Sequence, residues 1–349
     1  MTFSKYKKEI SRIAFKQFEA TYNKFSQYRI FQDFIAQKSA ELMQNNGWAD
    51  KPILSEEILS NWLDYYPFNK DCIALKLENL VKNLDNESKY IANSIYKRNF
   101  FLFSRKIKID IHKFNVMNIY SDFEKNEQTK FDLEKQNIWT EIVDYYSHGL
   151  FYLNQNILEY IKNKNFIDGG AFNGDSAIIL NKYKPSKIYS FEPISINFEK
   201  LEKRIEKYNV SNIVKIAKLG LGASSGNLEL YGEDENCSFI KPAKASKKET
   251  VEVVAIDDFC NKNDIKIGLI KLDVEGLEFD VIKGSLNTIK KDKPVLLISI
   301  YHTPDDFFEI KPLLEKETNY TFLIRPTSPY SLNTEFMLIG YPKELDLNE

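Results

Sequence analysis

Two carboxylates and a glycine-rich turn in the second half of the chain have the residue types and spacing of a nucleoside-binding site. Asp168 stands directly before Gly169 and Gly170, Gly174 follows, and Glu192 comes after a further helix-length segment. Glycines let a backbone approach a flat ligand closely, and a carboxylate can accept hydrogen bonds from both hydroxyls of a ribose. The pattern therefore predicts that the chain binds a cofactor containing a nucleoside.

The hydrophobic pattern around these residues predicts the elements that position them. An apolar strand ends at Asp168, residues 175–184 have the pattern of a helix, and residues 187–192 form a second strand that ends in Glu192. A strand, a glycine turn, a helix and a second strand make up half of a doubly wound, Rossmann-like α/β fold.

Two later apolar runs predict further strands of the same sheet. Residues 267–273 end in Asp273, and a run that starts at Pro294 is followed by His302. Continuous apolar runs are typical of parallel strands that are buried on both faces. The last two predicted strands, residues 320–325 and 335–341, are expected to pair as an antiparallel hairpin at the edge of this sheet.

Two cofactors compete for such a fold. A nicotinamide dinucleotide favours the spacing G-x-G-x-x-G, because backbone amides and a helix N-terminus must face its pyrophosphate. Here an acid, Asp168, precedes the glycines, where it would repel a pyrophosphate. S-adenosylmethionine carries no phosphate, and its ammonium and sulfonium groups tolerate a nearby carboxylate. The sequence favours S-adenosylmethionine as the cofactor.

Polar residues at the ends of these strands are candidates for the chemistry. Ligands bind outside the carboxyl ends of parallel strands, so Asp168, Glu192, Asp273 and His302 are expected to converge on one cleft. Methyl transfer to a hydroxyl is an in-line displacement that depends on positioning and gains from a base that takes the proton. We expect Asp273, Glu275 and His302 to be the catalytic residues. Of Asp273 and His302, we expect Asp273 to be the more important.

Two other roles are considered for polar residues of this half. Asp273 and Glu275, or the pair Asp257 and Asp258, could offer oxygen ligands to magnesium. Nothing in their spacing demands an ion, so no metal is predicted. His148 lies outside the predicted sheet and is expected to be structural.

Three segments together resemble the FkbM family of S-adenosylmethionine-dependent methyltransferases. They are FIDGGAFNGDS (166–176), SFEP (190–193) and IKLDVEGLEFDVIKGS (270–285), and the resemblance covers about residues 148–342. It implies O-methylation of a hydroxyl, commonly on a sugar or a polyketide. We expect a sugar of a glycan or nucleotide-sugar, in surface polysaccharide biosynthesis. The expected cofactor-binding residues are Asp168, Gly169, Gly170, Asn173, Gly174, Asp175, Glu192 and Pro193.

Composition limits the remaining possibilities. A hydrophobic share of 43% in 349 residues predicts a folded protein, and a net charge of −2 disfavours a nucleic-acid partner. The three cysteines lack metal-ligand spacing and are expected to be reduced thiols. The sequence shows neither a signal peptide nor an apolar run long enough to span a bilayer. We expect a cytoplasmic protein.

The chain is expected to have two parts. Residues 1–147 are predicted to be a mostly helical region of unknown role, and residues 148–349 the methyltransferase domain. Aromatic stripes in the first part indicate either core packing or a surface that docks the acceptor or a second subunit, which would make a homo-oligomer. Two other functions stay open: a nicotinamide-dependent enzyme acting on nucleotide-sugars, and a non-catalytic binding module of a glycan-assembly complex.

Overall fold

The computed structural model describes residues 62, 65, 72–104, 146–231, 248–327 and 335–346. All of them belong to one compact unit, made of Ser55–Ile107 and Asp122–Glu349. Most of the predicted N-terminal region lies outside the described residues, and so does the surface predicted there for an acceptor or a second subunit. The boundary between residues 147 and 148 stays a prediction.

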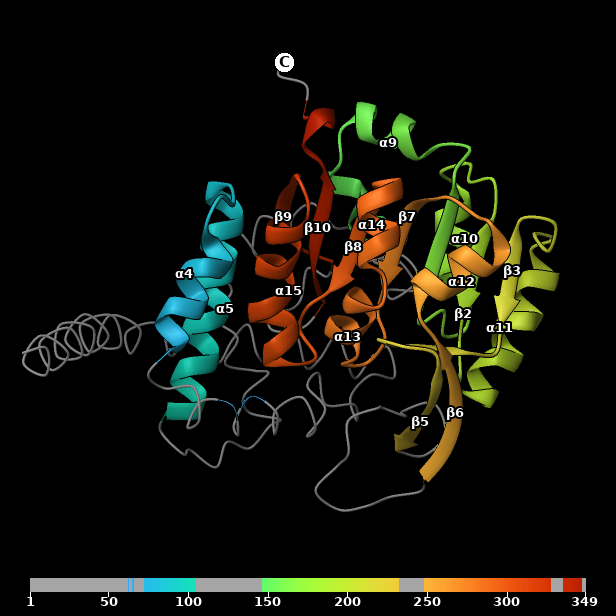
Figure 1. Cartoon of the computed structure of the whole chain (residues 1–349), viewed down its shortest axis with the longest axis horizontal. Coiled ribbons are helices and arrows are strands. Elements are labelled where there is room, and N and C mark those ends of the chain that lie inside the picture. The colour runs from blue at the N-terminus through green and yellow to red at the C-terminus, as the bar shows by residue number, and fades with distance from the viewer. Residues whose placement is uncertain are drawn as a thin grey trace, which may run out of the picture. The chain divides into compact units, whose positions relative to one another are not determined.

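A seven-stranded sheet forms the centre of this unit (Figure 1), in the order β3-β2-β1-β7-β8-β10-β9. Five adjacent strands, from β3 to β8 in that order, are parallel, as predicted. The strands are β1 Asn165–Gly169, β2 Ile188–Phe191, β3 Val214–Ala217, β7 Ile267–Leu272, β8 Val295–Ser299, β9 Tyr320–Pro326 and β10 Phe336–Pro342.

The predicted antiparallel hairpin is confirmed, with one difference in its placement. Strand β10 pairs antiparallel with both β9 and β8. The reversed strand therefore lies inside the sheet, and the edge strand β9 runs in the same direction as the parallel strands. The connection from β8 to β9 leaves one strand position open between them, and β10 fills it.

Helices flank the sheet, and two of them, α14 and α15, lie in front of it in Figure 1. Helix α15 begins with a capping box between Thr303 and Asp306 and has Pro304 in its first turn, a combination that fixes a helix start. The helices of this half are η1 Ser147–Tyr152, α9 Gln155–Ile161, α10 Asp175–Asn181, α11 Ser195–Lys207, α12 Ile256–Asn263, α13 Glu278–Lys283, α14 Leu286–Asp292, α15 Pro304–Glu317 and η2 Lys343–Leu345.

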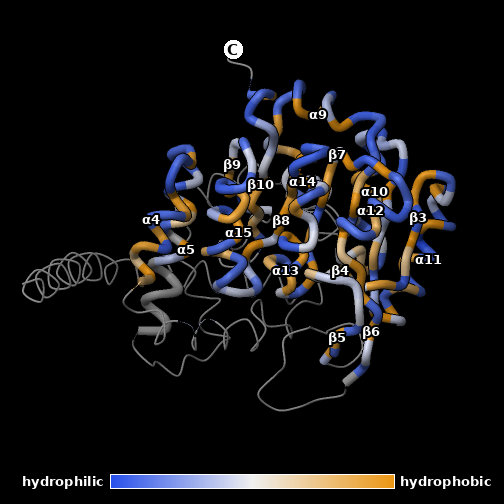
Figure 2. Tube along the Cα trace, viewed as in Figure 1, coloured by the Kyte–Doolittle hydropathy of each residue, from blue (hydrophilic) through white to orange (hydrophobic). Residues whose placement is uncertain are grey.

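The central strands are apolar along their length (Figure 2). Every residue of β7 and of β8 is buried, as the continuous apolar runs predict for strands covered on both faces. Their side chains join one core cluster with residues of the outer strands and helices, including Phe166, Leu180 and Ile339. Close packing of this core fixes where each strand ends.

A second, three-stranded sheet has the order β4-β6-β5. It consists of β4 Gly220–Leu221, β5 Gly226–Tyr231 and β6 Lys248–Val254. Strands β5 and β6 form an antiparallel pair, drawn below the main sheet in Figure 1. Helix α12 then starts directly after β6.

Two helices from the N-terminal part contact the far end of the main sheet. Helix α4, Ile73–Val81, packs against α15, and α5, Asn86–Ser104, packs against the edge strand β9. The Ser88 hydroxyl accepts a hydrogen bond from the Ile324 amide at 2.8 Å, and Arg325 forms ion pairs with Asp85 and Glu87. In the described part of the chain, no helix has both the length and the apolar surface needed to cross a bilayer.

Candidate active site

The glycine-rich turn connects β1 to α10 through a left-handed backbone. The φ angles are 70° at Gly170, 45° at Phe172 and 87° at Gly174, values that favour glycine. A Cβ atom on Gly170 would lie 1.7 Å from the Asp273 carbonyl oxygen. The sequence analysis attributed the glycines to the approach of a ligand, but at Gly170 the close neighbour is the protein's own backbone. Gly170 lets the end of β1 pack against the end of β7.

Asp168 is fully buried and its contacts are within the protein. Its Oδ2 accepts hydrogen bonds from the hydroxyls of Ser176, at 2.8 Å, and Ser190, at 3.1 Å. Its Oδ1 lies 3.3 Å from Lys271 Nζ. Asp168 therefore ties β1 to β2, β7 and α10, and its role in cofactor binding stays a prediction.

Lys271 is a residue that the sequence analysis missed. It is 2% exposed and donates hydrogen bonds to the carbonyls of Gly170, at 2.8 Å, and Gly169, at 3.3 Å. Burial lowers its pKa, but the carboxylates of Asp168 and Asp273 outweigh this and raise the pKa above its ordinary value. A charged residue inside an otherwise apolar strand is rare unless it is paired, and that signal was readable in the sequence.

Glu192 lies at the end of β2, beside the glycine turn. Its Oε2 accepts a hydrogen bond from the Phe172 amide and its Oε1 accepts one from the Ile194 amide, both at 2.9 Å. The Asn197 side chain also hydrogen-bonds to this carboxylate, and because a carboxylate has about four lone-pair sites, part of its acceptor capacity remains. Burial raises the pKa of Glu192 to about 7, against the lowering effect of these two amides. Glu192 thus has the place and the remaining acceptor capacity that a ribose requires.

The other predicted cofactor residues lie around the same turn. Asn173 accepts a hydrogen bond from the Asp175 amide at 3.2 Å, and Asp175 accepts one from the Ser176 amide at 2.8 Å. Gly169 is packed against Leu221 and Leu272. Pro193 directly follows Glu192.

The predicted catalytic residues meet at the ends of β7 and β8, which are adjacent as expected. His302 Nε2 lies 3.5 Å from Asp273 Oδ1 and 3.5 Å from Glu275 Oε2. The side chain of His302 is 2% exposed, whereas those of Asp273 and Glu275 are 29% and 59% exposed. The two carboxylates therefore form the open side of the cluster and the imidazole its inner side.

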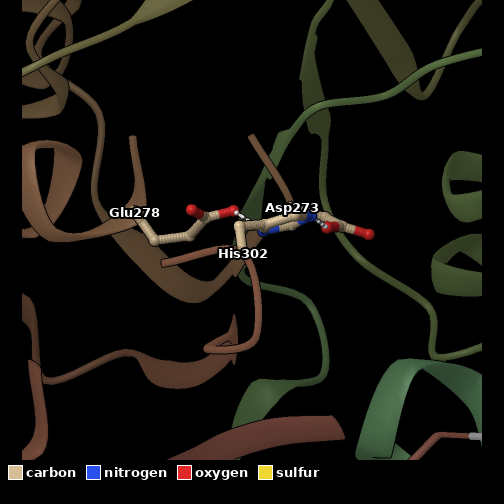
Figure 3. Close-up of side chains that lie close together, drawn as sticks. All are labelled: Asp273, Glu278 and His302. Carbon is tan, nitrogen blue, oxygen red and sulfur yellow. Dashed lines mark ion pairs between the residues drawn. The ribbon is translucent and has the colours of Figure 1, made fainter. Parts of the chain in front are cut away.

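Glu278 holds the inner side of the imidazole, as Figure 3 shows. Its Oε1 lies 2.9 Å from His302 Nδ1. The same carboxylate accepts hydrogen bonds from the amides of Val274, at 2.7 Å, and Gly276, at 2.9 Å. The sequence analysis did not place Glu278 among the catalytic residues. The structure makes it a positioning residue, since it fixes both the turn after β7 and the orientation of His302.

The charges of this cluster set its protonation. Burial lowers the pKa of His302, but Glu278 and Glu275 outweigh this and raise it well above its ordinary value. Burial and Asp273 raise the pKa of Tyr301 well above its ordinary value, so its hydroxyl keeps its proton and donates to Asp273 Oδ1 at 3.3 Å. Asp273 is therefore a partly exposed acceptor that lies between two donors, the Tyr301 hydroxyl and the His302 imidazole.

The residues Asp273, Glu278 and His302 also have a spacing that a metal ion could use. Their ligand atoms lie within 4.8 Å of one another. Both oxygens of Glu278, however, already accept backbone hydrogen bonds and one faces His302. Of the pair also considered, Asp257 accepts hydrogen bonds from Asn287 and Thr288 at the start of α14, and Asp258 accepts one from the Ser225 hydroxyl. We assign the cluster to ion pairing, and the absence of a metal stays a prediction.

The two groups of residues adjoin each other. The Asp273 amide donates a hydrogen bond to the Gly169 carbonyl at 3.1 Å, so the turn that carries the catalytic carboxylates touches the glycine-rich turn. Of the four strand-end residues expected in one cleft, Glu192 and Asp273 lie at this edge as acceptors, and His302 lies behind Asp273 with carboxylates beside both ring nitrogens. Asp168 lies beneath them in the core.

Comparison with known proteins agrees with this geometry. Residues 168–323 match the family model of the Methyltransferase FkbM domain. "Methyltransferase 1" of Beauveria bassiana (strain ARSEF 2860) is 27% identical over 181 residues, covering 45% of this chain and 72% of that protein. "Methyltransferase sdnD" of Sordaria araneosa is 26% identical over 156 residues, covering 35% and 60%.

One similar crystal structure supports the fold. It is that of Methyltransferase FkbM from Methylobacillus flagellatus KT, with a TM-score of 0.51 and 21% identity over 80% of this chain. The match covers 61% of that protein, so the chain spans about three fifths of its length, as it does for sdnD. Residues 168–323, less than half of the chain, are similar to the FkbM methyltransferase domain, and this similarity indicates an enzyme that transfers a methyl group from S-adenosylmethionine.

Proposed function

We propose that the protein methylates a hydroxyl of a sugar, in a glycan or a nucleotide-sugar, during surface polysaccharide synthesis. The observation that carries O-methylation is the placement of Asp273. Its carboxylate is partly exposed next to the glycine-rich turn and is held by Tyr301 and His302. A carboxylate in this position can accept a hydrogen bond from the hydroxyl that receives the methyl group. Methylation of a nitrogen, carbon or sulfur atom would not require this hydrogen bond from a hydroxyl.

The proposed mechanism gives each residue a separate task. The donor supplies an activated methyl group on its sulfonium. Asp273 accepts the hydroxyl proton as the new oxygen–carbon bond forms and the sulfur–carbon bond breaks, and protonated His302 stabilises Asp273 from behind. Glu275, more exposed, orients the hydroxyl from the other side. A placed base contributes roughly 100- to 10,000-fold, and the rest comes from holding the reactants in line.

The residues around the glycine-rich turn fit this donor. Its ribose requires acceptors, and the Glu192 carboxylate retains part of its acceptor capacity beside its bonds with two backbone amides and Asn197. Its ammonium and sulfonium groups are cationic, and Asp175 and Asp273 lie on either side of the turn. We propose that Glu192 accepts hydrogen bonds from the ribose hydroxyls.

Donor affinity is expected to rise with pH because Glu192, with a pKa of about 7, accepts ribose hydrogen bonds best when ionised. Only about a tenth of this carboxyl is ionised at pH 6 and about nine tenths at pH 8. Calorimetry with S-adenosylhomocysteine should show affinity rising by up to about tenfold over this range. Glu192→Gln should weaken binding by about tenfold at pH 8 and have little effect at pH 6.

Comparing wild type with Glu192→Gln separates the effect of Glu192 from that of other groups that titrate between pH 6 and pH 8. A pH dependence that persists unchanged in Glu192→Gln would place its origin elsewhere. An affinity of Glu192→Gln within about twofold of wild type at pH 8 would remove Glu192 from the ribose site.

The acceptor is proposed from two observations. The FkbM resemblance implies hydroxyls of sugars or polyketides, and the net charge of −2 gives no field to attract nucleic acid. Surface carbohydrate from cells that lack the protein should be missing one O-methyl group when compared by mass spectrometry with the parent. Restoring the intact gene should restore it, and a gene encoding Asp273→Ala should not. An unchanged carbohydrate would redirect the search to lipid-like hydroxyls such as polyketides.

A further inference from the structure

The turn at the start of η1 has an unusual backbone. Three consecutive residues, Ser147, His148 and Gly149, have φ angles of 46°, 52° and 95°. The first two are not glycine, and a left-handed conformation at such residues costs free energy. The turn persists because Gly149 packs against the side chains of Ile339 and Leu297 in the core. This backbone holds the imidazole of His148 in one place.

That place is next to the donor site. Segment η1 contacts α10, the helix that the glycine-rich turn opens, and also contacts β8 and β10. The charges that act on the imidazole belong to Lys271, Asp175, Asp168 and Asp273. These residues come from the ends of β1 and β7 and from the first turn of α10. His148 therefore lies within electrostatic reach of the glycine-rich turn and of the turn after β7.

The imidazole has a polar atom without a partner. Within the described part of the chain, His148 Nε2 is buried and makes no hydrogen bond. Leaving such an atom unpaired is costly, and a specific case in a folded protein calls for an explanation, often a ligand. Burial and Lys271 lower the pKa of His148, so the ring is neutral and one of its nitrogens carries a lone pair.

We propose that His148 Nε2 binds the amino-acid end of the methyl donor, by accepting a hydrogen bond from its α-ammonium group. This rests on the proposed donor site. With the ribose at Glu192 after β2, the rest of the donor extends along the strand ends toward β1 and β7, the next two strands of the sheet, and charges at the ends of these two strands act on His148. Three carboxylates and one ammonium act electrostatically on the imidazole, an excess of negative charge that favours the cationic group of the amino-acid end.

Two ligands separate this contact from the rest of the donor. S-adenosylhomocysteine has the amino-acid end, and 5′-methylthioadenosine lacks it but keeps the ribose and base. In calorimetry on the full chain, His148→Ala should weaken the affinity for S-adenosylhomocysteine by about tenfold. Its affinity for 5′-methylthioadenosine should stay within about twofold of that of wild type. His148→Gln, whose amide oxygen can accept near the position of Nε2, should recover part of the loss.

The outcomes distinguish this proposal from the donor site on which it rests. If wild type binds neither ligand, the donor site itself is wrong. If wild type binds both and His148→Ala weakens them equally, the substitution acts through the turn. If S-adenosylhomocysteine binding is unchanged, Nε2 is satisfied by something else, such as a buried water. Either of the last two results overturns the proposal for His148, and thermal unfolding of each variant shows whether the fold is retained.

Discussion

Replacing Asp273 by alanine is expected to lower turnover by roughly 100-fold or more at saturating donor, while donor affinity stays close to that of wild type. Asp273 is the partly exposed carboxylate at the end of β7, and removing its side chain leaves the backbone hydrogen bond from its amide to Gly169 in place. His302→Ala should also lower turnover, because Asp273 loses the imidazolium 3.5 Å from its Oδ1. The measurement is initial rate at saturating donor, together with donor affinity by calorimetry.

A matched control lies on the next helix. Asp280 in α13 is 49% exposed and pairs with Lys283, so Asp280→Ala changes the charge near the site without touching the cluster and should keep wild-type turnover. Losses below about tenfold in both Asp273→Ala and His302→Ala would defeat the general-base mechanism. Methyl transfer would then depend on positioning alone.

Replacing Gly170 by valine is expected to prevent the native fold from forming. The new Cβ would lie 1.7 Å from the Asp273 carbonyl oxygen, and that oxygen belongs to a backbone held by its own hydrogen bond to β1. The φ angle of 70° adds strain for a β-branched residue. Overpacking of this kind against backbone exceeds the usual cost of about 1–3 kcal/mol for a crowded side chain. Urea unfolding should show a much lower midpoint, or no cooperative transition.

Gly226 provides the comparison, because a Cβ atom there would meet no atom within 4 Å. Gly226→Val should unfold at nearly the wild-type urea concentration. A Gly170→Val protein with the wild-type midpoint and lost donor binding would return Gly170 to the role first predicted for it, clearance for the ligand.

The sequence predicted where strands end far better than where side chains point. The apolar runs before Asp168 and Asp273 located β1 and β7, because a strand buried on both faces leaves a continuous apolar signal. That signal says nothing of which way the residue after the run faces. Asp168 turned inward to two serines and Lys271, whereas Asp273 remained partly exposed.

Contacts between distant segments account for the other differences. Glu278 and His302 meet because α13 packs against α15, the helix that begins just after His302, and neither residue's spacing in the chain indicates the other. His148 was expected to be structural because it lies outside the predicted sheet, and that role stays a prediction; the sequence did not indicate that its segment η1 contacts β8 and β10. Lys271 is the exception: a lysine within a buried strand is a local signal that its charge must be neutralised by a neighbour.

The contact between α5 and β9 has a consequence for truncation of this chain. An edge strand exposes unpaired amides that can pair with the edge of another molecule and lead to aggregation. Here Ser88 satisfies the Ile324 amide, and Asp85 and Glu87 neutralise Arg325 beside it. A piece trimmed to the matched residues 168–323 would lack this cover, and would also lack β10, the strand that holds β9 to β8. The region that matches the family model is thus smaller than the region whose contacts hold and cover β9.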